Sequence, residues 1–545
     1  MSLKNLFHKK NKEKEICSEG YGTSKEEPSS IEFVGKYFYN KDQPKTGQII
    51  SDRTCKDLNI DELFDFIDRT HSKIGEQFLY NRLRTIPENP KDLSDQEYVI
   101  SQIGNDRNLR LQLKKTLQKL DKPEAYSICS IFQEEHLKRP KWFFIIPVLS
   151  LISLSLLVAS AFISKLFIPF ICVFIINLWF HYSNKKNLYS YISTLPQLHK
   201  LNIAADCLSK LNLLQEQDHQ LKRSIKEINQ LKGQMSFLKM EESLQSDVGE
   251  LLWGVLELIK IGFLVEPILL FHIIDKLENK RSEINEIFDF VGKVDTLQSI
   301  ASLRLSLPNY CIPDIHAEPK TLQAEALYHP LIENCISNNV KMNYKSMLLT
   351  GSNMSGKTTF IRTIGVNALT AFTINTSFAK SFSLPRMNIW TAIRINDDLL
   401  NDKSYYFEEV LTIKEMIDKS QNGQANLFLL DEIFKGTNTI ERISAGKAVL
   451  SSLNQNTNLV FVSTHDIELA DLLKTEYDLY HFNEQVQNDT IYFDYKLKTG
   501  KLKFRNAIRI LEINNYPSHI TNEAFEISEN LEEMNMISKR SDVNE

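Results

Sequence analysis

The residues best suited to chemistry in this 545-residue chain form a short glycine-containing stretch in its second half. An apolar run, Met347–Leu349, precedes two glycines, Gly351 and Gly356, which are followed by Lys357-Thr358. This spacing is that of a phosphate-binding loop, in which backbone N–H groups surround the phosphates, the lysine reaches the terminal ones and the threonine hydroxyl binds Mg²⁺. A helix that begins at the lysine would add the positive end of its dipole. We therefore predict that ATP and Mg²⁺ bind here, at Gly351, Ser352, Asn353, Met354, Ser355, Gly356, Lys357, Thr358 and Thr359.

A second apolar run, Leu427–Leu430, ends in two adjacent carboxylates, Asp431 and Glu432. In nucleotide hydrolases an aspartate at a strand end holds Mg²⁺, and the next carboxylate can orient the attacking water. The pair therefore predicts Asp431 as a metal ligand together with Thr358, and Glu432 as a catalytic residue.

A third apolar run, Leu459–Val462, leads into Ser463-Thr464-His465. A lone histidine is more often structural than functional. This one, however, would lie at the carboxyl end of a strand, where α/β sheets bind their ligands, and it follows two other strand-end motifs. We interpret His465 as a γ-phosphate sensor that is catalytic together with Lys357 and Glu432. The three motifs predict an α/β ATP hydrolase domain.

The composition limits the other classes of function. The formal net charge is −5, so no overall basic field indicates nucleic acid, and DNA binding would need a local basic patch. The seven cysteines show no C-x-x-C spacing, which predicts reduced side chains in a cytosolic compartment and no metal site among them. The N-terminal residues lack an apolar segment of the secretory type.

Helical patterns fill most of the chain before the ATPase motifs. The N-terminal residues are rich in Lys, Glu and Ser and predict a flexible segment, apart from a short apolar patch at Ile31–Tyr39. From Leu58 onwards, apolar residues recur near a period of 3.6. Leu251–Ile274 is strongly apolar but contains three charged residues, so we expect it to be buried or interfacial rather than a membrane span.

Two uncharged runs interrupt the helical region. Trp142–Ile163 has 22 residues, enough to cross a hydrocarbon core of about 30 Å, whereas the 15 residues of Leu166–Phe180 are few for a span. A buried core hairpin is the alternative, but such a run exceeds what a globular helix needs to bury. Basic residues flank both ends: Lys138, Arg139, Lys141, Lys185 and Lys186. By the positive-inside rule we predict a transmembrane hairpin in the cell (inner) membrane, with the ATPase domain and both termini cytoplasmic.

Taken together, the motifs resemble those of the MutS DNA mismatch repair ATPases. The phosphate loop has the family's Asn-Met pair, Asp431–Thr437 resembles its second nucleotide motif with a loop that reaches across a dimer, and Ser463–His465 resembles its histidine switch. Leu63–Thr70 is similar to the start of the family's helical lever domain, and Val294–Ala301 to its end. The resemblance implies an ATP-hydrolysing homodimer that binds mismatched or branched DNA, with Asn438 and Thr439 approaching the partner's nucleotide.

The sequence also departs from the family. It leaves no room before Leu58 for the N-terminal mismatch-reading domain, and its helical region is short for a DNA-encircling clamp. Asn438 stands where the family uses a serine across the dimer interface. The missing mismatch-reading domain and the acidic pI favour an alternative function, an ATP-driven conformational switch on membrane or protein partners that has lost mismatch recognition, whereas the retained lever domain favours DNA binding. A transporter is less favoured, because two helices per chain give only four per dimer.

We therefore expect a helical lever domain, interrupted by a transmembrane hairpin and followed by a P-loop α/β ATPase domain. The predicted segments are a flexible segment at 1–55, helical parts at 56–137 and 187–310 on either side of the hairpin at 138–186, the ATPase domain at 320–530 and a flexible tail at 531–545. The predicted function is a membrane-anchored, MutS-like ATP hydrolase whose homodimer binds mismatched or structured DNA in an ATP-dependent manner.

Overall fold

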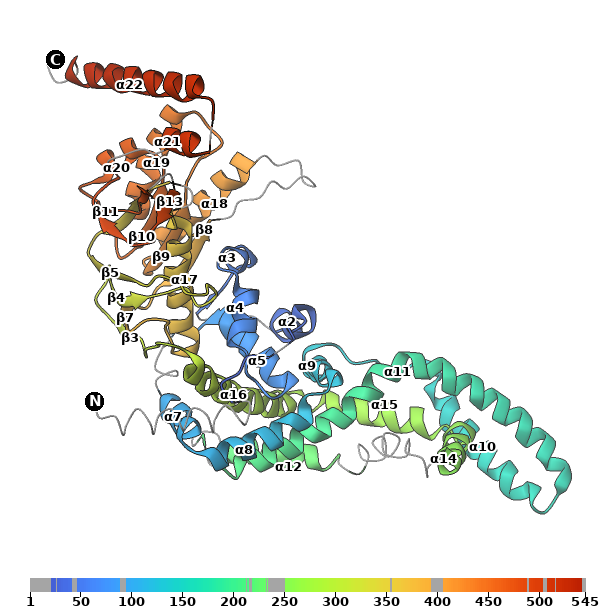
Figure 1. The fold of residues 1–545 in the computed structure, drawn as a ribbon. Coiled ribbons are helices and arrows are strands. Elements are labelled where there is room, and N and C mark those ends of the chain that lie inside the picture. The colour runs from blue at the N-terminus through green and yellow to red at the C-terminus, as the bar shows by residue number, and fades with distance from the viewer. Residues whose placement is uncertain are drawn as a thin grey trace. The chain divides into compact units, whose positions relative to one another are not determined.

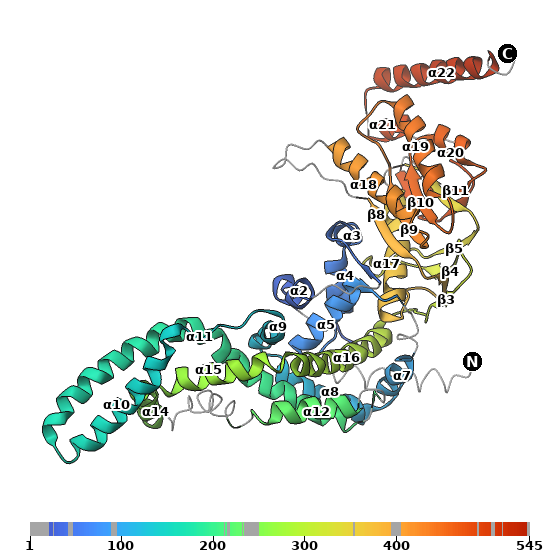
Figure 2. The same cartoon turned by 180° about the vertical axis from the view of Figure 1, so that it is seen from behind.

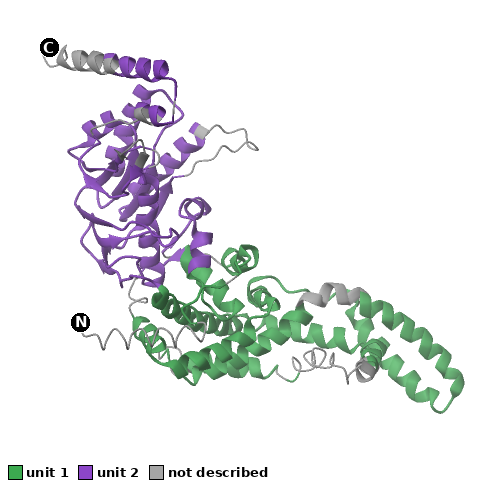
Figure 3. Cartoon of the chain, viewed as in Figure 1, with its two compact units in different colours: residues 1–45, 67–84, 95–306 green, residues 46–66, 85–94, 307–545 purple. Residues whose placement is uncertain are grey.

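The structure, a computed structural model, describes residues 21–25, 27–41, 47–88, 95–211, 213–214, 218–231, 233, 250–352, 355–393, 405–487, 490–502, 507–514 and 516–541. The chain forms two compact units, which Figure 3 colours separately. Unit 1 contains residues 1–45, 67–84 and 95–306, and unit 2 contains residues 46–66, 85–94 and 307–545. The fold is mixed helical and α/β, and this level of the predicted fold class is confirmed.

Unit 1 is built around the long helix α16 (Arg281–Ser306), which is drawn in yellow-green in Figure 1. Its buried apolar residues recur every three or four positions, as in Ile284, Ile287, Val291 and Val294, so one face of the helix enters the core. It packs against α5 (Lys73–Arg84), α7 (Glu97–Asn105), α11 (Phe167–Ser209) and α12 (Asp218–Asn229). Further helices of this unit are α2 (Ile31–Tyr39), α8 (Arg107–Leu117), α9 (Ile128–Gln133), α10 (Ile145–Ser160), α14 (Glu250–Gly262) and α15 (Val265–Glu278).

A buried carboxylate joins α16 to the beginning of α5. Asp295 accepts hydrogen bonds from the backbone N–H groups of His71 and Ser72, both at 2.9 Å, and from the Ser72 hydroxyl at 2.5 Å. Burial is the main cause that raises the pKa of Asp295 to about 7. Gly75 lies directly against this carboxyl group, because a Cβ built on Gly75 would be 2.6 Å from Asp295 Cγ and 2.9 Å from its Cβ. The close approach requires glycine.

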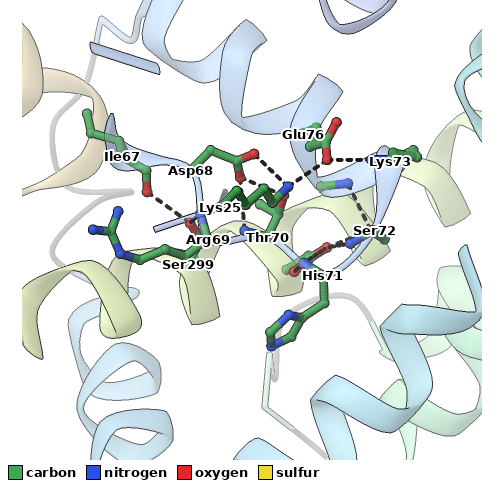
Figure 4. Close-up of polar contacts among 12 residues, drawn as sticks. Lys25, Ile67, Asp68, Arg69, Thr70, His71, Ser72, Lys73, Glu76 and Ser299 are labelled. Carbon is green, nitrogen blue, oxygen red and sulfur yellow. Dashed lines mark hydrogen bonds and ion pairs between the residues drawn. The ribbon is translucent and has the colours of Figure 1, made fainter. Parts of the chain in front are cut away.

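Beside this carboxylate, an N-terminal lysine holds two more acids of the same unit (Figure 4). Lys25 Nζ lies 2.6 Å from Asp68 Oδ2 and 2.6 Å from Glu76 Oε1. Asp68 also accepts from the Thr70 hydroxyl at 2.6 Å. Buried charges are stable only when they are paired and hydrogen-bonded. Lys25 therefore neutralises Asp68, which precedes α5, and Glu76, which lies in its first turn.

Helix α10 and the first part of α11 form a hairpin that extends away from α16, with α14 and α15 packed at its base (Figures 1 and 2). Two segments, Lys141–Ser160 and Ser164–Tyr182, are long and apolar enough to cross a membrane, and only 11% of each is buried. Large apolar side chains on them are therefore exposed, for example Phe144 (68%), Leu151 (65%) and Ile168 (69%). These two segments are not core helices of the described unit.

Unit 2 contains a six-stranded sheet with the strand order β14-β11-β6-β10-β9-β8. The neighbouring strands β6 (Ser346–Thr350), β10 (Leu459–Thr464) and β9 (Asn426–Asp431) are parallel and almost fully buried. Strands buried on both faces have continuous apolar sequences rather than alternating ones, which is why these runs are visible in the sequence. The parallel strands β11 (Tyr477–His481) and β8 (Asn388–Ala392) lie on either side of them, and β14 (Lys498–Thr499) is antiparallel.

The other elements of unit 2 surround this sheet. A second sheet has the order β3-β7-β4-β5, from Asp314–His316, Ser381–Pro385, Thr321–Leu327 and Asn338–Asn343. The helices of unit 2 that follow β6 in the chain are α17 (Lys357–Ile374), α18 (Tyr405–Ser420), α19 (Thr439–Leu453), α20 (Ile467–Leu473), α21 (Ala507–Ile513) and α22 (Ser518–Ser541). Two-stranded pairs are formed by β12 (Glu484–Gln487) with β13 (Thr490–Phe493), and by β1 (Gln48–Ile49) with β2 (Thr85–Ile86).

A segment from the first part of the chain, which contains α3 (Asp52–Asp57) and the start of α4 (Ile60–Ile67), also belongs to unit 2. The Gln48 amide donates to the backbone oxygen of Ile389 and accepts from its N–H, both at 2.7 Å. Leu58 packs so closely on α17 that a Cβ on Gly365 would be 2.7 Å from it and 2.6 Å from Leu429. The segment therefore completes the core around α17.

Candidate functional site

The parallel pairing of three strands brings the predicted motifs to one edge of the sheet. In the register, Ser463 on β10 lies opposite Asp431 on β9, and Thr464 lies opposite Thr350 on β6. The chain leaves β6 directly into Gly351, so the glycine loop, the acidic pair and the histidine motif all follow neighbouring strand ends. This is the edge at which open α/β sheets bind ligands.

The glycine loop has the backbone that its sequence requires. Gly351 and Gly356 have φ values of 148° and 103°, in the region that favours glycine. At Gly351 there is also no room for a side chain, because a Cβ would be 2.7 Å from the backbone oxygen of Phe482. Two of the predicted ligands, Asn353 and Met354, lie outside the described residues.

Lys357 begins α17 and turns back into the loop. Its Nζ donates to the backbone oxygens of Gly351 and Ser352, both at 2.8 Å, and the side chain is buried. Burial lowers the pKa of Lys357, which is opposed by the charges of Glu432 and Asp431. The ammonium group is therefore held inside the loop that an anion would occupy.

Thr358 and Asp431 are in direct contact, as the sequence predicts for a shared metal site. The Thr358 hydroxyl donates to Asp431 Oδ2 at 2.7 Å, and the Ser463 hydroxyl donates to Asp431 Oδ1. A hydroxyl and a carboxylate are hard oxygen donors of the kind that Mg²⁺ prefers, so these residues fit that ion. Ser463 belongs to the histidine motif but was not predicted to be a site residue. The observation that identifies it is its position opposite Asp431 in the strand register.

Glu432 forms the centre of a small charged cluster. His465 Nε2 lies 2.5 Å from its Oε1, and Lys435 Nζ lies 2.9 Å from its Oε2. Burial alone would raise the pKa of Glu432, but the hydrogen bonds from His465 and Lys435 outweigh it and lower the pKa to about 2. The structure thus brings two predicted catalytic residues, Glu432 and His465, into contact, and it keeps the carboxylate ionised.

Asn438 and Thr439, predicted to approach a partner's nucleotide, lie at the exposed start of α19. The Asn438 side chain accepts from the backbone N–H of Glu441 at 3.0 Å and so caps the helix. Ile440, the next residue after Thr439, is 79% exposed. Asn438 therefore has a local structural role in a single chain, and its loop is open to the solvent.

Helix α19 is fastened to the histidine motif by a bidentate ion pair. Arg442 Nε and Nη2 donate to the two carboxylate oxygens of Asp466 at 2.9 Å and 2.7 Å. The hydrogen bond to Asp466 raises the pKa of Arg442. Since Asp466 follows His465 directly, the pair couples the position of His465 to the start of α19.

Comparison with known proteins agrees with this arrangement. Residues 347–532 match the family model MutS domain V. The chain is 30% identical over 252 residues to the DNA mismatch repair protein MutS of Aquifex pyrophilus, which covers 44% of this chain and 29% of that protein. It is 30% identical over 271 residues to the corresponding protein of Thermotoga maritima (47% and 33%) and 27% identical over 283 residues to that of Listeria welshimeri (50% and 32%).

The chain spans about a third of the length of these curated relatives. The match to domain V begins on β6, before the glycine loop, and extends past β14, so it contains the whole strand-end cluster. Residues 347–532, which carry all three strand-end motifs, are thus similar to domain V of the MutS family.

Proposed function

We propose that unit 2 is a P-loop ATPase domain that hydrolyses ATP with Mg²⁺. The observation that carries this proposal is the contact of Thr358 with Asp431 and of Glu432 with His465 at adjacent strand ends. A cluster with only a structural role would not require a buried lysine that donates to the backbone of a loop whose two glycines have positive φ values. MutS proteins are ATPases, and the matched region includes all of these residues.

In this proposal each residue has a defined task. The loop N–H groups and Lys357 bind the phosphates, and Lys357 exchanges its two backbone oxygens for phosphate oxygens. Thr358 and Asp431 would hold Mg²⁺, which would supply positive charge to the phosphates, and the Ser463 hydroxyl fixes the orientation of the Asp431 carboxylate. The N-terminal end of α17 adds its positive dipole to the same place.

Glu432 orients the attacking water, and His465 controls it. The hydrogen bonds from His465 and Lys435 hold Glu432 in its ionised form, so the carboxylate can accept a hydrogen bond from the attacking water. His465 would turn from Glu432 towards the γ-phosphate when ATP binds, and this movement is the basis of its role as a sensor.

The test is ATP turnover by the purified full chain with Mg²⁺, compared for the wild type and Glu432→Gln. We expect turnover to fall by about 100-fold or more while ATP binding persists, since the change removes a group needed for the water attack. The control is Glu325→Gln, an exposed glutamate on β4 of the same unit, which should be unchanged. Wild-type turnover in Glu432→Gln would refute the assigned role.

We also propose that two chains form a homodimer that binds mismatched or branched DNA in response to ATP. The relatives are named as DNA mismatch repair proteins, and MutS proteins bind DNA as dimers. The open loop at Asn438 and the exposed Ile440 are placed at the start of a helix, where a second subunit could reach them. Binding of homoduplex, mismatched and branched DNA at a stated salt concentration, with and without ATP, tests this proposal. Equal and salt-sensitive binding to all three would contradict it.

Membrane anchoring is the third part of the proposal. Two adjacent segments of membrane-spanning length with 11% burial would expose a large apolar area to water, and lipid removes that cost. Basic residues at both ends of the hairpin support an arrangement in the cell (inner) membrane with the ATPase unit and both termini on the cytoplasmic side. Replacement of 138–186 by a Gly/Ser linker should move the chain from the membrane fraction to the soluble fraction. A chain that stays in the membrane fraction would contradict the anchor.

One observation favours the alternative function, an ATP-driven switch on membrane or protein partners. Helix α11 is continuous from Phe167 to Ser209, so it carries the second candidate span and also packs against α16 in the helical core. A membrane event could therefore reach the core of unit 1 without crossing a loop. ATP turnover that responds to lipid but not to any DNA would select this function.

A further inference from the structure

The last turns of helix α14, over the residues whose side chains the structure describes, have the reverse of the polarity expected on a water-soluble surface. Leu258 and Ile259 are 57% and 43% exposed, whereas Ile261 is buried. The charged residues Glu257 and Lys260 face inward, with side chains only 14% and 9% exposed. Water favours the opposite arrangement, whereas apolar-out and charged-in is the arrangement that hydrocarbon favours.

The inward charges meet partners at the base of the α10–α11 hairpin. His181 on α11 lies 3.7 Å from Glu257 and 3.7 Å from Glu266 on α15, and Lys260 lies 3.8 Å from Glu257. All four side chains are buried or nearly so. The charges of α14 and α15 are thus gathered against one another, away from the surface that Leu258 and Ile259 form.

The end of α14 docks on α11 within the second candidate span. Asn177 donates to the backbone oxygen of Gly262 at 2.7 Å, and Gly262 lies so near Phe174 that a Cβ would be 3.4 Å from its ring. Asn177 is five residues before Tyr182, where the candidate span ends. At 1.5 Å per residue the contact is about 7.5 Å inside the span, and interfacial helices bury their apolar faces about 5–10 Å deep.

The direction of α14 agrees with this depth. Figures 1 and 2 show α14 nearly end-on, whereas α10 and α11 lie along the plane of the picture, so α14 crosses the hairpin rather than continuing it. A helix that crosses two spans near their cytoplasmic ends lies along the membrane surface.

We propose that α14 is an interfacial helix that lies in the cytoplasmic leaflet, with Leu258 and Ile259 in contact with lipid acyl chains. This inference rests on the proposed membrane anchoring. Helix α14 packs against α11 within the second candidate span, so its exposed apolar residues lie on the same part of the unit as the exposed apolar hairpin, and this continuity favours lipid over a second copy of the chain as the occupant. The protein then contacts the bilayer through two spans and one surface helix. The ion pairs of His181, Glu257, Lys260 and Glu266 lie on the side of α14 that faces the protein.

The experiment uses the full wild-type chain in vesicles of phosphatidylcholine and phosphatidylglycerol. A phosphatidylcholine with a diazirine on its acyl chain is photolysed, and labelled peptides are identified by mass spectrometry. Peptides of α10 and α11 up to Tyr182 report on the anchor, peptides of α14 report on this inference, and α12 is the aqueous control. We expect label on α14 and on the spans, and none on α12.

Two variants sharpen the result. Leu258→Lys should lower the labelling of α14 by about threefold, since a charge is costly in the acyl region. Leu111→Lys, at an exposed leucine of α8, should leave it unchanged. Label on the spans but not on α14 would overturn the inference and leave the anchor standing, and it is also the result expected for a second copy that covers α14. No label on the spans would overturn both.

Discussion

Replacing Gly75 by alanine should destabilise unit 1, although the same change in an ordinary helix is stabilising. A Gly-to-Ala change inside a helix normally gains about 0.5–1 kcal/mol. At Gly75, however, the new Cβ would overlap the carboxyl group of Asp295, at 2.6 Å from its Cγ. Asp295 accepts hydrogen bonds from four groups of His71, Ser72 and Gln298 and is fully buried, so a shift of its carboxyl group would disturb these contacts.

The magnitude follows from these contacts. Overpacking costs about 1–3 kcal/mol, and each hydrogen bond weakened at a buried charged group costs about 1.5–3 kcal/mol. After subtraction of the helix gain, we expect a net loss of about 2–4 kcal/mol in the opening free energy of α5. Since 1.4 kcal/mol corresponds to a factor of ten, amides of α5 and α16 should exchange about 30- to 1000-fold faster.

Hydrogen exchange by mass spectrometry on the full chain in detergent measures this directly, because it reports the opening of one region without requiring two-state unfolding. The matched control is Gly104→Ala in α7, where a Cβ would meet nothing within 4 Å. That variant should exchange at the wild-type rate or more slowly. Wild-type protection of α5 in Gly75→Ala would refute the argument that Asp295 excludes a side chain there.

Further predictions concern the nucleotide site, pH and the ion pair of α19. Lys357→Ala should abolish binding of a fluorescent ATP analogue, because it removes the positive charge that faces the phosphates; binding at wild-type affinity would contradict this. Asp295 has a folded-state pKa raised to about 7 from 3.8, so the folded state keeps a proton that the unfolded state loses. This difference should make α5 less stable as the pH rises from about 4 to 7, by up to about 1.4 kcal/mol per pH unit. In Asp295→Asn, the hydrogen-exchange rates of α5, corrected for the intrinsic effect of pH, should no longer show this pH dependence. Arg442→Ala and Asp466→Asn should each lower ATP turnover by about fivefold through misplacement of His465, and the double variant should be no worse than either; additive losses would show that the two residues act separately.

Much of the nucleotide site could be predicted because its signals are local. Leu427–Leu430 lies within β9 and Leu459–Val462 within β10, since a parallel strand that is buried on both faces needs an uninterrupted apolar run. The polar residues that directly follow each run then lie at the carboxyl ends of the strands, where open α/β sheets bind their ligands. The predicted MutS resemblance is confirmed by the match over residues 347–532.

Contacts between distant residues had no such signal. Gly75 and Asp295 are far apart in sequence, and neither lies in a motif that indicates the other. The pairing of Glu432 with Lys435 and His465 depends on the path of the chain after β9, where Glu432 has a positive φ of 53°. In Leu251–Ile274, the charges led to the expectation of a buried or interfacial segment rather than a membrane span, but only the positions of His181 and Glu266 reveal which way these charges face. The segment boundaries, the roles of the site residues and the membrane location stay predictions.

The length of α11 makes bilayer thickness a variable to which this protein would respond. The candidate span Ser164–Tyr182 has 19 residues, which correspond to about 28 Å of helix, slightly less than an average hydrocarbon core. A thinner bilayer would be matched by greater tilt of this span, and α11 has no break at Tyr182, so the tilt is carried onward as far as Pro196, where a helix can kink. From Tyr182 to Pro196 the helix is about 21 Å long, so a tilt of about 10° displaces this point by about 4 Å. Hydrophobic mismatch would thus act on the packing of α11 against α16, and membranes of different thickness would select different arrangements of the helical core.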